Sequence, residues 1–102
     1  MSEGFIAIYR WRVEPGQEAA FRETWRAITD GAKHHGSLGS TLALDEDGIW
    51  TAIALWPSIE TRDAAFAQMD ESPAWPPCER LSETRLAVVD DRWARSPFVG
   101  ES

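Results

Sequence analysis

Apolar residues occur at two different spacings along this chain, and each spacing predicts a different kind of element. Residues 5–13 (Phe-Ile-Ala-Ile-Tyr-Arg-Trp-Arg-Val) are rich in aromatic and β-branched side chains, which is typical of a strand. Residues 14–16 (Glu-Pro-Gly) then end this strand as a turn. Residues 17–32 predict an amphipathic helix, because one face of it is an apolar stripe that contains Phe21, Trp25, Ile28 and Ala32.

The middle of the chain predicts a hairpin followed by a second helix. Residues 38–44 and 49–56 have the composition of strands, and the Asp-Gly pair between them is favoured in tight hairpin turns. Pro57 ends the second of these strands. Ser58 is placed to cap a helix that extends to about Met69.

The remaining residues complete a βαββαβ order. A Pro-rich loop leads to a short helical turn expected at residues 78–82, and residues 84–93 are expected to form the last strand. This order predicts an α+β, ferredoxin-like domain, with a four-stranded antiparallel sheet and two helices on one of its faces. The domain is expected to span residues 5–93, with a polar C-terminal tail at residues 94–102.

The two predicted central strands are apolar on both faces. One row combines large aromatic residues with alanines and comprises Phe5, Ala7, Tyr9, Trp11, Trp50, Ala52, Ala54 and Trp56. The other row is aliphatic and comprises Ile6, Ile8, Ile53 and Leu55. We expect the aliphatic row to face the helices and the aromatic row to form the open face. Monomers rarely expose so large an aromatic patch, so a second subunit or a flat ligand is expected to cover it.

Composition excludes several classes of function. The chain has 102 residues and a net charge of -7, so it lacks the basic surface of a nucleic-acid-binding or anionic-membrane-binding protein. No apolar run is long enough for a membrane helix, the start lacks the basic residues of a secretory signal, and a cytoplasmic location is expected. The single cysteine, Cys78, excludes an intrachain disulfide and a cysteine-based zinc site. No metal site and no nucleotide cofactor are expected, since no phosphate-binding loop or metal-ligand spacing occurs.

Six tryptophans make aromatic residues the main candidates for chemistry. Tyr9 is a candidate catalytic residue, because its hydroxyl could hydrogen-bond a phenolate or ketone oxygen, and Trp56 could stack on a flat substrate. Trp11, Trp50 and Phe5, on the same rows, are candidate substrate contacts. The alternative for Tyr9, Trp56, Trp11 and Trp50 is that they serve only to pack the sheet or the dimer.

Two further residues are candidates because they carry or accept charge. Arg10 lies on the opposite parity from Tyr9 and could anchor an anionic substrate, or it could pair with a surface carboxylate. His35 lies at the expected end of the first helix. It could act as a general base near neutral pH, or it could be an exposed residue at a helix end.

Three segments resemble the antibiotic biosynthesis monooxygenase family. The first is residues 8–18 (Ile-Tyr-Arg-Trp-Arg-Val-Glu-Pro-Gly-Gln-Glu) together with Phe21. The others are residues 36–39 (Gly-Ser-Leu-Gly) and Trp56, which ends a strand just before a Ser-capped helix. The resemblance covers about residues 5–93. It implies a dimeric α+β barrel, in which two sheets pack face to face and each subunit keeps a pocket between its sheet and its helices or loops.

The same resemblance narrows the expected activity. The haem-degrading branch of the family uses an Asn, a Trp and a His at positions that correspond here to Tyr9, Trp56 and approximately Cys78, so haem degradation is not expected. The anthrone-oxidising branch uses Asn, Trp, Tyr and Arg, and this chain contains no Asn. We expect a cofactor-independent monooxygenase that oxygenates a small or polycyclic aromatic, anthrone-like or quinol-like, with O2. The alternative is a non-catalytic homodimeric module that binds an apolar ligand or serves assembly only.

Overall fold

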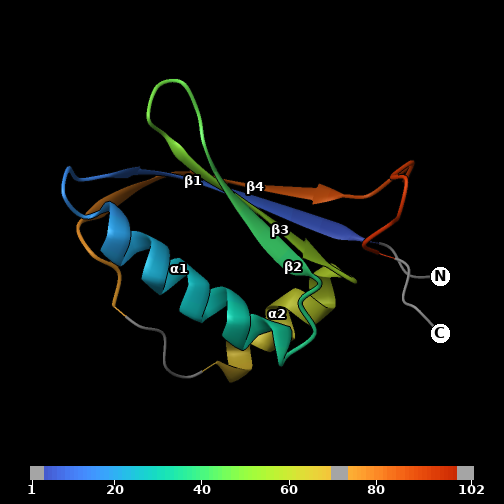
Figure 1. Ribbon diagram of the computed structural model, residues 1–102. Coiled ribbons are helices and arrows are strands. Elements are labelled where there is room, and N and C mark those ends of the chain that lie inside the picture. Colours follow the sequence, from blue (N-terminus) through green and yellow to red (C-terminus); the bar gives the residue numbers. More distant parts are fainter. Residues whose placement is uncertain (1–3, 70–73, 99–102) are drawn as a thin grey trace.

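The computed structural model describes residues 4–69 and 74–98, which form one sheet covered by two helices. In chain order the elements are β1 (Phe5–Val13), α1 (Glu18–Lys33), β2 (Gly39–Leu44), β3 (Trp50–Trp56), α2 (Ile59–Gln68) and β4 (Cys78–Ala87). The strands are antiparallel in the order β2-β3-β1-β4, and both helices lie on the same face (Figure 1). The α+β, ferredoxin-like βαββαβ fold predicted from the sequence is confirmed.

Two local signals in the sequence correspond to observed turns and caps. In the β2–β3 hairpin, the Asp45 carboxylate accepts hydrogen bonds from the backbone N–H groups of Asp47 at 2.8 Å and Ile49 at 2.9 Å. The bond from Ile49 holds the pKa of Asp45 below its ordinary value, because it favours the ionised carboxylate. Gly48 adopts the positive φ of 79° that this turn requires. Ser58 caps α2 by accepting from the backbone N–H of Thr61 at 3.1 Å.

The last strand differs from the prediction. β4 begins at Cys78 and ends at Ala87, so the expected strand at residues 84–93 and the helical turn at residues 78–82 are wrong in their bounds and type. The cause is tertiary pairing. β4 pairs with β1 along its whole length, from Phe5 opposite Ala87 to Val13 opposite Cys78. The length of β1 therefore sets where β4 begins and ends, which no local pattern in residues 78–93 reveals.

The assignment of the two sheet faces is also corrected. The aromatic row faces the helices: Trp56 is 2% exposed and Ala7 is fully buried. The aliphatic row lies on the face without helices, where Ile53 is 38% exposed. The physical reason is that alternation along a strand separates two faces without identifying them. When both rows are apolar, only the helices decide which one is the core.

Helix α1 fixes this choice through Phe21. Its side chain is fully buried, and its ring lies 5.2 Å from those of Trp11 and Trp75 and 5.6 Å from that of Trp50. Edge-to-face and tilted contacts of this kind are favourable between aromatic rings. Phe21 thus joins the helix to the aromatic row of the sheet.

The predicted tail is described as far as residue 98. The Phe98 ring lies against Gly4, close enough that a Cβ at position 4 would approach it to 2.6 Å. Residues 99–102 of the predicted tail lie outside the described residues.

Neither α1 nor α2 combines the length and the apolar character that a bilayer crossing requires, and no other helix occurs in the described ranges.

Candidate functional site

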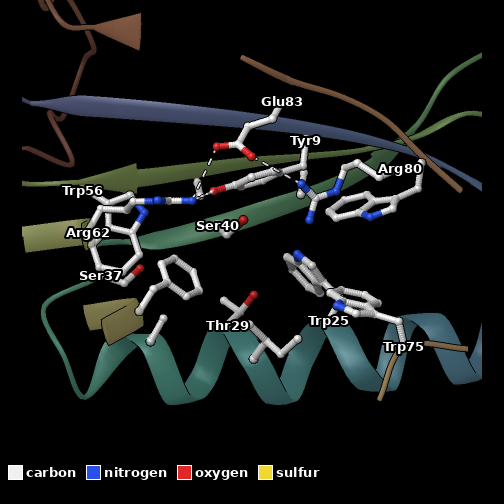
Figure 2. A pocket seen from close by; sticks show the side chains of 16 residues that line it. Tyr9, Trp25, Thr29, Ser37, Ser40, Trp56, Arg62, Trp75, Arg80 and Glu83 are labelled. Atoms are coloured by element: carbon white, nitrogen blue, oxygen red, sulfur yellow. Dashed lines mark hydrogen bonds and ion pairs between the residues drawn. The ribbon is translucent and has the colours of Figure 1, made fainter. Parts of the chain in front are cut away.

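A cavity of about 270 Å³ lies between the aromatic face of the sheet and the two helices. Figure 2 shows it with the sheet above and α1 below. Small side chains form part of its wall on the sheet side, because Ala52 and Ala54 of β3 stand between larger residues. Ile28, Thr29 and Ala32 of α1 line the opposite side. The alternation of large and small residues along β3 therefore creates the space.

Aromatic rings enclose most of the remaining wall. Trp11 of β1 and Trp75 of the α2–β4 loop lie at one end, with 5.5 Å between their ring centroids, and Trp25 of α1 lines the cavity beside them. Trp56 and Phe66 form the other end, 5.9 Å apart. Flat apolar walls of this kind suit a flat aromatic ligand.

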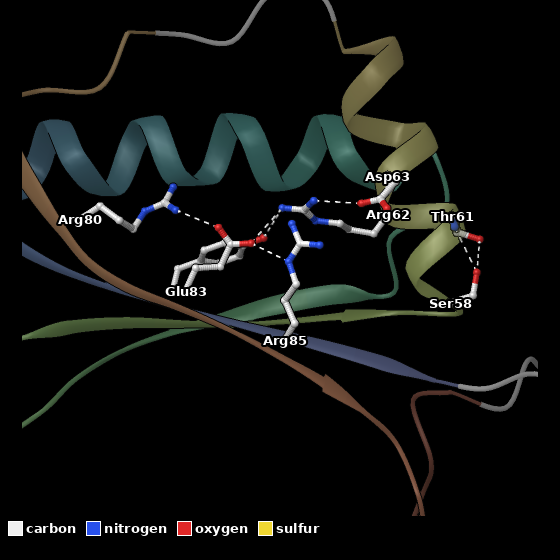
Figure 3. A network of polar contacts seen from close by, with 8 residues as sticks. Ser58, Thr61, Arg62, Asp63, Arg80, Glu83 and Arg85 are labelled. Carbon is white, nitrogen blue, oxygen red and sulfur yellow. Dashed lines mark hydrogen bonds and ion pairs between the residues drawn. The ribbon is translucent and has the colours of Figure 1, made fainter.

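Three arginines converge on one carboxylate at the edge of the cavity (Figure 3). Glu83 pairs with Arg62 at 3.5 Å, with Arg80 at 3.4 Å and with Arg85 at 3.0 Å. Arg62, Arg80 and Glu83 line the cavity, whereas Arg85 does not. The charged groups of the lining therefore carry one more positive than negative charge, and we expect an electrostatic preference for anions.

Arg62 connects this network to Tyr9. Its Nη2 donates to the Tyr9 hydroxyl at 3.0 Å, and its side chain is 15% exposed. Burial lowers the pKa of Arg62, but the hydrogen bonds to Tyr9 and Asp63 and the charge of Glu83 raise it by more, so the pKa lies above its ordinary value. Arg62 is thus a permanent cation here. Because the Tyr9 oxygen accepts from Arg62, the hydroxyl hydrogen remains available to a ligand.

A β-bulge places Arg80 at the cavity. Arg10 pairs with Ser82, but the next residue, Trp11, pairs with Arg80, so the register of β1 and β4 shifts by one residue. Without the shift, Arg80 would lie on the opposite face of the sheet. With it, the Arg80 guanidinium lies 4.9 Å from the centroid of the Tyr9 ring and 5.3 Å from that of Trp11.

Three buried polar atoms, all in residues that line the cavity, have no hydrogen-bond partner among the described residues. They are Trp56 Nε1, Ser40 Oγ and Arg62 Nε. A buried donor without an acceptor costs free energy comparable to a lost hydrogen bond. All three belong to residues that line the same cavity, but the atoms themselves are covered by neighbouring atoms and do not face its open space.

The structure brings together three of the residues singled out from the sequence. Tyr9, Trp56 and Trp11 all line the cavity. Phe5 is buried in the core beside Trp56 and does not line it. Trp50 lies on the same face but borders a second groove, between α1 and the β2–β3 hairpin, which shares Trp25 and Ser40 with the cavity.

Two candidates lie away from the cavity. Arg10 projects from the opposite face of the sheet, where it pairs with Asp45 at 3.1 Å. This is the surface pairing that the sequence left as its alternative role. His35 follows the last turn of α1, with its backbone N–H bonded to the Ala32 carbonyl at 2.9 Å, and its side chain does not line the cavity. The chain reverses after α1 and carries His35 away from the sheet-facing stripe.

Sequence reasoning missed the charged residues of the site. The sequence does contain a signal that could have identified Arg62. It lies four residues before the aromatic residue Phe66, so the two share one face of the predicted helix. Their contact is seen as a guanidinium 4.7 Å from the Phe66 ring centroid. No local signal in the sequence identifies Glu83 or Arg80, because the bounds of β4 and its bulge come from pairing with β1.

Comparisons of the sequence give no match to a family model and none to a curated protein. Comparisons of the fold find many similar solved structures. A candidate monooxygenase from Shewanella loihica PV-4 has a TM-score of 0.69 at 20% identity, covering 89% of this chain and 99% of that one. A heme-degrading protein from Mycobacterium tuberculosis has a TM-score of 0.68 at 18% identity, covering 92% and 100%.

SnoaB, a cofactor-independent oxygenase from Streptomyces nogalater, was solved as a mutant and has a TM-score of 0.63 at 15% identity, covering 91% and 98% of the two chains. Other matches are candidate antibiotic biosynthesis monooxygenases. At identities this low, the structural matches establish a shared fold and nothing more. The shared fold extends over nearly the whole of both chains. The chain therefore has the fold of the antibiotic biosynthesis monooxygenases, as the resemblance in its sequence predicted.

Proposed function

We propose that this protein is a cofactor-independent monooxygenase that acts on a small aromatic substrate in the cavity between its sheet and its helices. The observation that carries the proposal is a cavity walled by aromatic rings and lined by Tyr9 and by the two arginines that contact Tyr9, Arg62 and Arg80. The shared fold with SnoaB supports it, since that protein is a cofactor-independent oxygenase.

The size of the cavity limits the substrate. An engineered cavity of about 150 Å³ accommodates benzene. A cavity of about 270 Å³ therefore suits one or two rings. We propose a one- or two-ring phenol, anthrone-like or quinol-like, in place of the larger polycyclic substrates that the family resemblance also allowed.

The residues of the cavity suit a reaction in which the substrate itself reduces oxygen. The Trp rings would hold the substrate flat and exclude water, and Tyr9 would donate to its oxygen. Arg62 and Arg80 would favour the ionised substrate, since a positive charge within about 4–6 Å lowers the pKa of an acid by roughly 1–3 units. The ionised substrate transfers an electron to O2, and the two radicals combine at the ring carbon. At a ring carbon ortho or para to the ionised oxygen, the C–H bond is replaced by a C=O bond and the phenol oxygen also becomes a carbonyl oxygen, so the ring is oxidised to a quinone and O2 is reduced. One oxygen atom enters the product as the new carbonyl oxygen, and the other leaves as water with the hydrogens of the C–H and O–H groups.

No described side chain of the lining is free to act as a strong base. Glu83 is paired with three arginines, and the lining contains no His among the described residues. We therefore propose that the positive charge of the cavity ionises the substrate and that its proton leaves to solvent.

The direct test is oxygen consumption by the purified protein with a panel of one- and two-ring phenols and hydroquinones. We expect consumption above the spontaneous rate, with one atom of isotopically labelled O2 in the product. If no member of the panel raises consumption while the same compounds bind, the oxygenase proposal is wrong.

That outcome would support the second candidate, a non-catalytic module that binds a small aromatic ligand. The observation that favours it is the engagement of Glu83 by three arginines, which leaves the described lining without a free base. A binding module would show saturable binding and unchanged ligand, whereas an oxygenase would release an oxidised product.

We also propose that the open face of the sheet forms a homodimer interface. That face carries an aliphatic row with Ile6, Ile8, Ile53, Leu55 and Leu86, of which Leu86 is 42% exposed. A contiguous apolar face of this kind usually marks an interaction site. We expect light scattering to give a mass near twice 11.4 kDa, and an Ile53→Lys variant to be monomeric. A monomeric parent protein at micromolar concentration would contradict this.

A further inference from the structure

We propose that Ala54 determines how many rings the cavity accepts, and that the ligand is a two-ring aromatic with one of its rings lying over Ala54. This inference rests on the cavity of the proposed function and narrows its substrate class from one or two rings to two.

Ala54 lies on the sheet side of the cavity, between its two ends. It belongs to the helix-facing row of β3 and lines the cavity, and in the register of the sheet it lies opposite Ser40 of β2. Figure 2 shows Ser40 between Trp56 at one end of the cavity and Trp75 at the other. A ligand that extends from one end to the other therefore passes over position 54.

The surface that Ala54 retains belongs to the cavity wall. Its neighbours on the same face of β3, Ala52 and Trp56, are both 2% exposed, whereas Ala54 is only partly buried. Its partners on the adjacent strands, Ala7 and Ser40, are small as well. No large side chain of the adjacent strands therefore fills the space in front of Ala54, and the size of residue 54 itself decides how much of that space remains.

The volume of the cavity makes this position decisive. The cavity measures about 270 Å³. In another protein, a leucine-to-alanine change in the core leaves a space of about 150 Å³ that accommodates one benzene ring. The reverse change at position 54 would therefore remove roughly the space of one ring and leave roughly the space of one ring.

The same volume favours a ligand with two rings over a ligand with one. A single ring would leave about half of the cavity empty, and the side chains that line an empty space lose their dispersion contacts on that side. A second ring over Ala54 restores these contacts and buries more apolar surface of the ligand.

The test compares two neutral probes, 2-naphthol with two rings and 4-methylphenol with one. Titration of the indole N–H signals of 15N-labelled protein gives both affinities. We expect the parent protein to bind naphthol at least about tenfold more tightly, because the second ring buries additional apolar surface. In Ala54→Leu, naphthol affinity is expected to fall by about tenfold or more, the usual scale of overpacking, while methylphenol affinity stays within about threefold. Retained binding of methylphenol shows that the variant is folded.

Ala67→Leu is the matched control, because it adds the same side-chain atoms at an exposed position of α2 that does not line the cavity. It is expected to keep both affinities. Ala54→Val adds fewer atoms and suits a strand, so it is expected to weaken naphthol binding less than Ala54→Leu does. It decides the matter if the Leu variant does not fold.

Four results would overturn the inference: equal affinity of the parent for the two probes, no saturable binding of either, equal losses of both probes in the variants at position 54, or a loss of naphthol binding in Ala67→Leu as large as that in Ala54→Leu. The expected pattern of binding without oxygen consumption contradicts only the oxygenase.

Discussion

Replacement of Phe21 by Ala is expected to remove about 3–5 kcal/mol from the free energy of unfolding, the usual cost of deleting a buried aromatic ring. Phe21 is fully buried, with the rings of Trp11, Trp50 and Trp75 within 5.6 Å. Small domains have free energies of unfolding of roughly 5–15 kcal/mol, so this single change removes a large part of the total stability. The cavity beside Trp11 and Trp75 is expected to lose its shape as well.

Urea unfolding followed by circular dichroism measures this loss, and Phe66→Ala provides the matched control on the other helix. Phe66 is 38% exposed, so its removal leaves a smaller void and costs less. A loss in Phe21→Ala no larger than that in Phe66→Ala would contradict the central place given to Phe21 in the core.

Replacement of Tyr9 by Phe is expected to lower the kcat/KM for oxygen consumption by about 10²–10³, the usual effect of removing one preorganised donor from a developing oxyanion. The substitution keeps the aromatic ring but removes the hydroxyl, which accepts from Arg62 and whose hydrogen is available to the substrate. Trp56→Phe, which replaces an indole of the cavity wall by a smaller ring, is expected to act in the same direction.

Steady-state oxygen consumption measures both effects. Trp50→Phe is the control, because Trp50 lies on the same strand as Trp56 but outside the cavity, and its activity is expected to stay near that of the parent. Full activity in both Trp56→Phe and Tyr9→Phe would remove these side chains from the chemistry.

The fold was predictable because its signals are local. The stripe of α1, the Asp-Gly turn and the Ser58 cap each depend on residues within a few positions of one another. The face of the sheet that packs against the helices was not predictable in this way. Ile8 and Tyr9 point to opposite faces, and the rows to which they belong are both apolar. The family resemblance placed a pocket between sheet and helices, and the cavity lies there. The row assignment, made from residue type alone, pointed to the other face.

The charged part of the site was unpredictable for a related reason. Arg80 reaches the cavity only through the bulge at Trp11, and Glu83 only through the pairing of β4 with β1. Both are long-range features that the composition of residues 78–87 does not encode. Arg10, which was predicted to anchor an anionic substrate, carries the positive charge that this role requires but lies on the face of the sheet opposite the cavity.

The central claim is that the ligand binds between sheet and helices, against Trp56. The six tryptophans allow a direct measurement, because each indole N–H gives its own signal in a 15N-labelled sample, assigned by Trp→Phe variants. On titration with 2-naphthoate, the signals of Trp56, Trp11, Trp25 and Trp75, whose side chains line the cavity, are expected to shift. The signal of Trp93, which is 59% exposed and outside the cavity, is expected to stay. An unmoved Trp56 signal, with shifts confined to Trp93 or Trp50, would contradict the account.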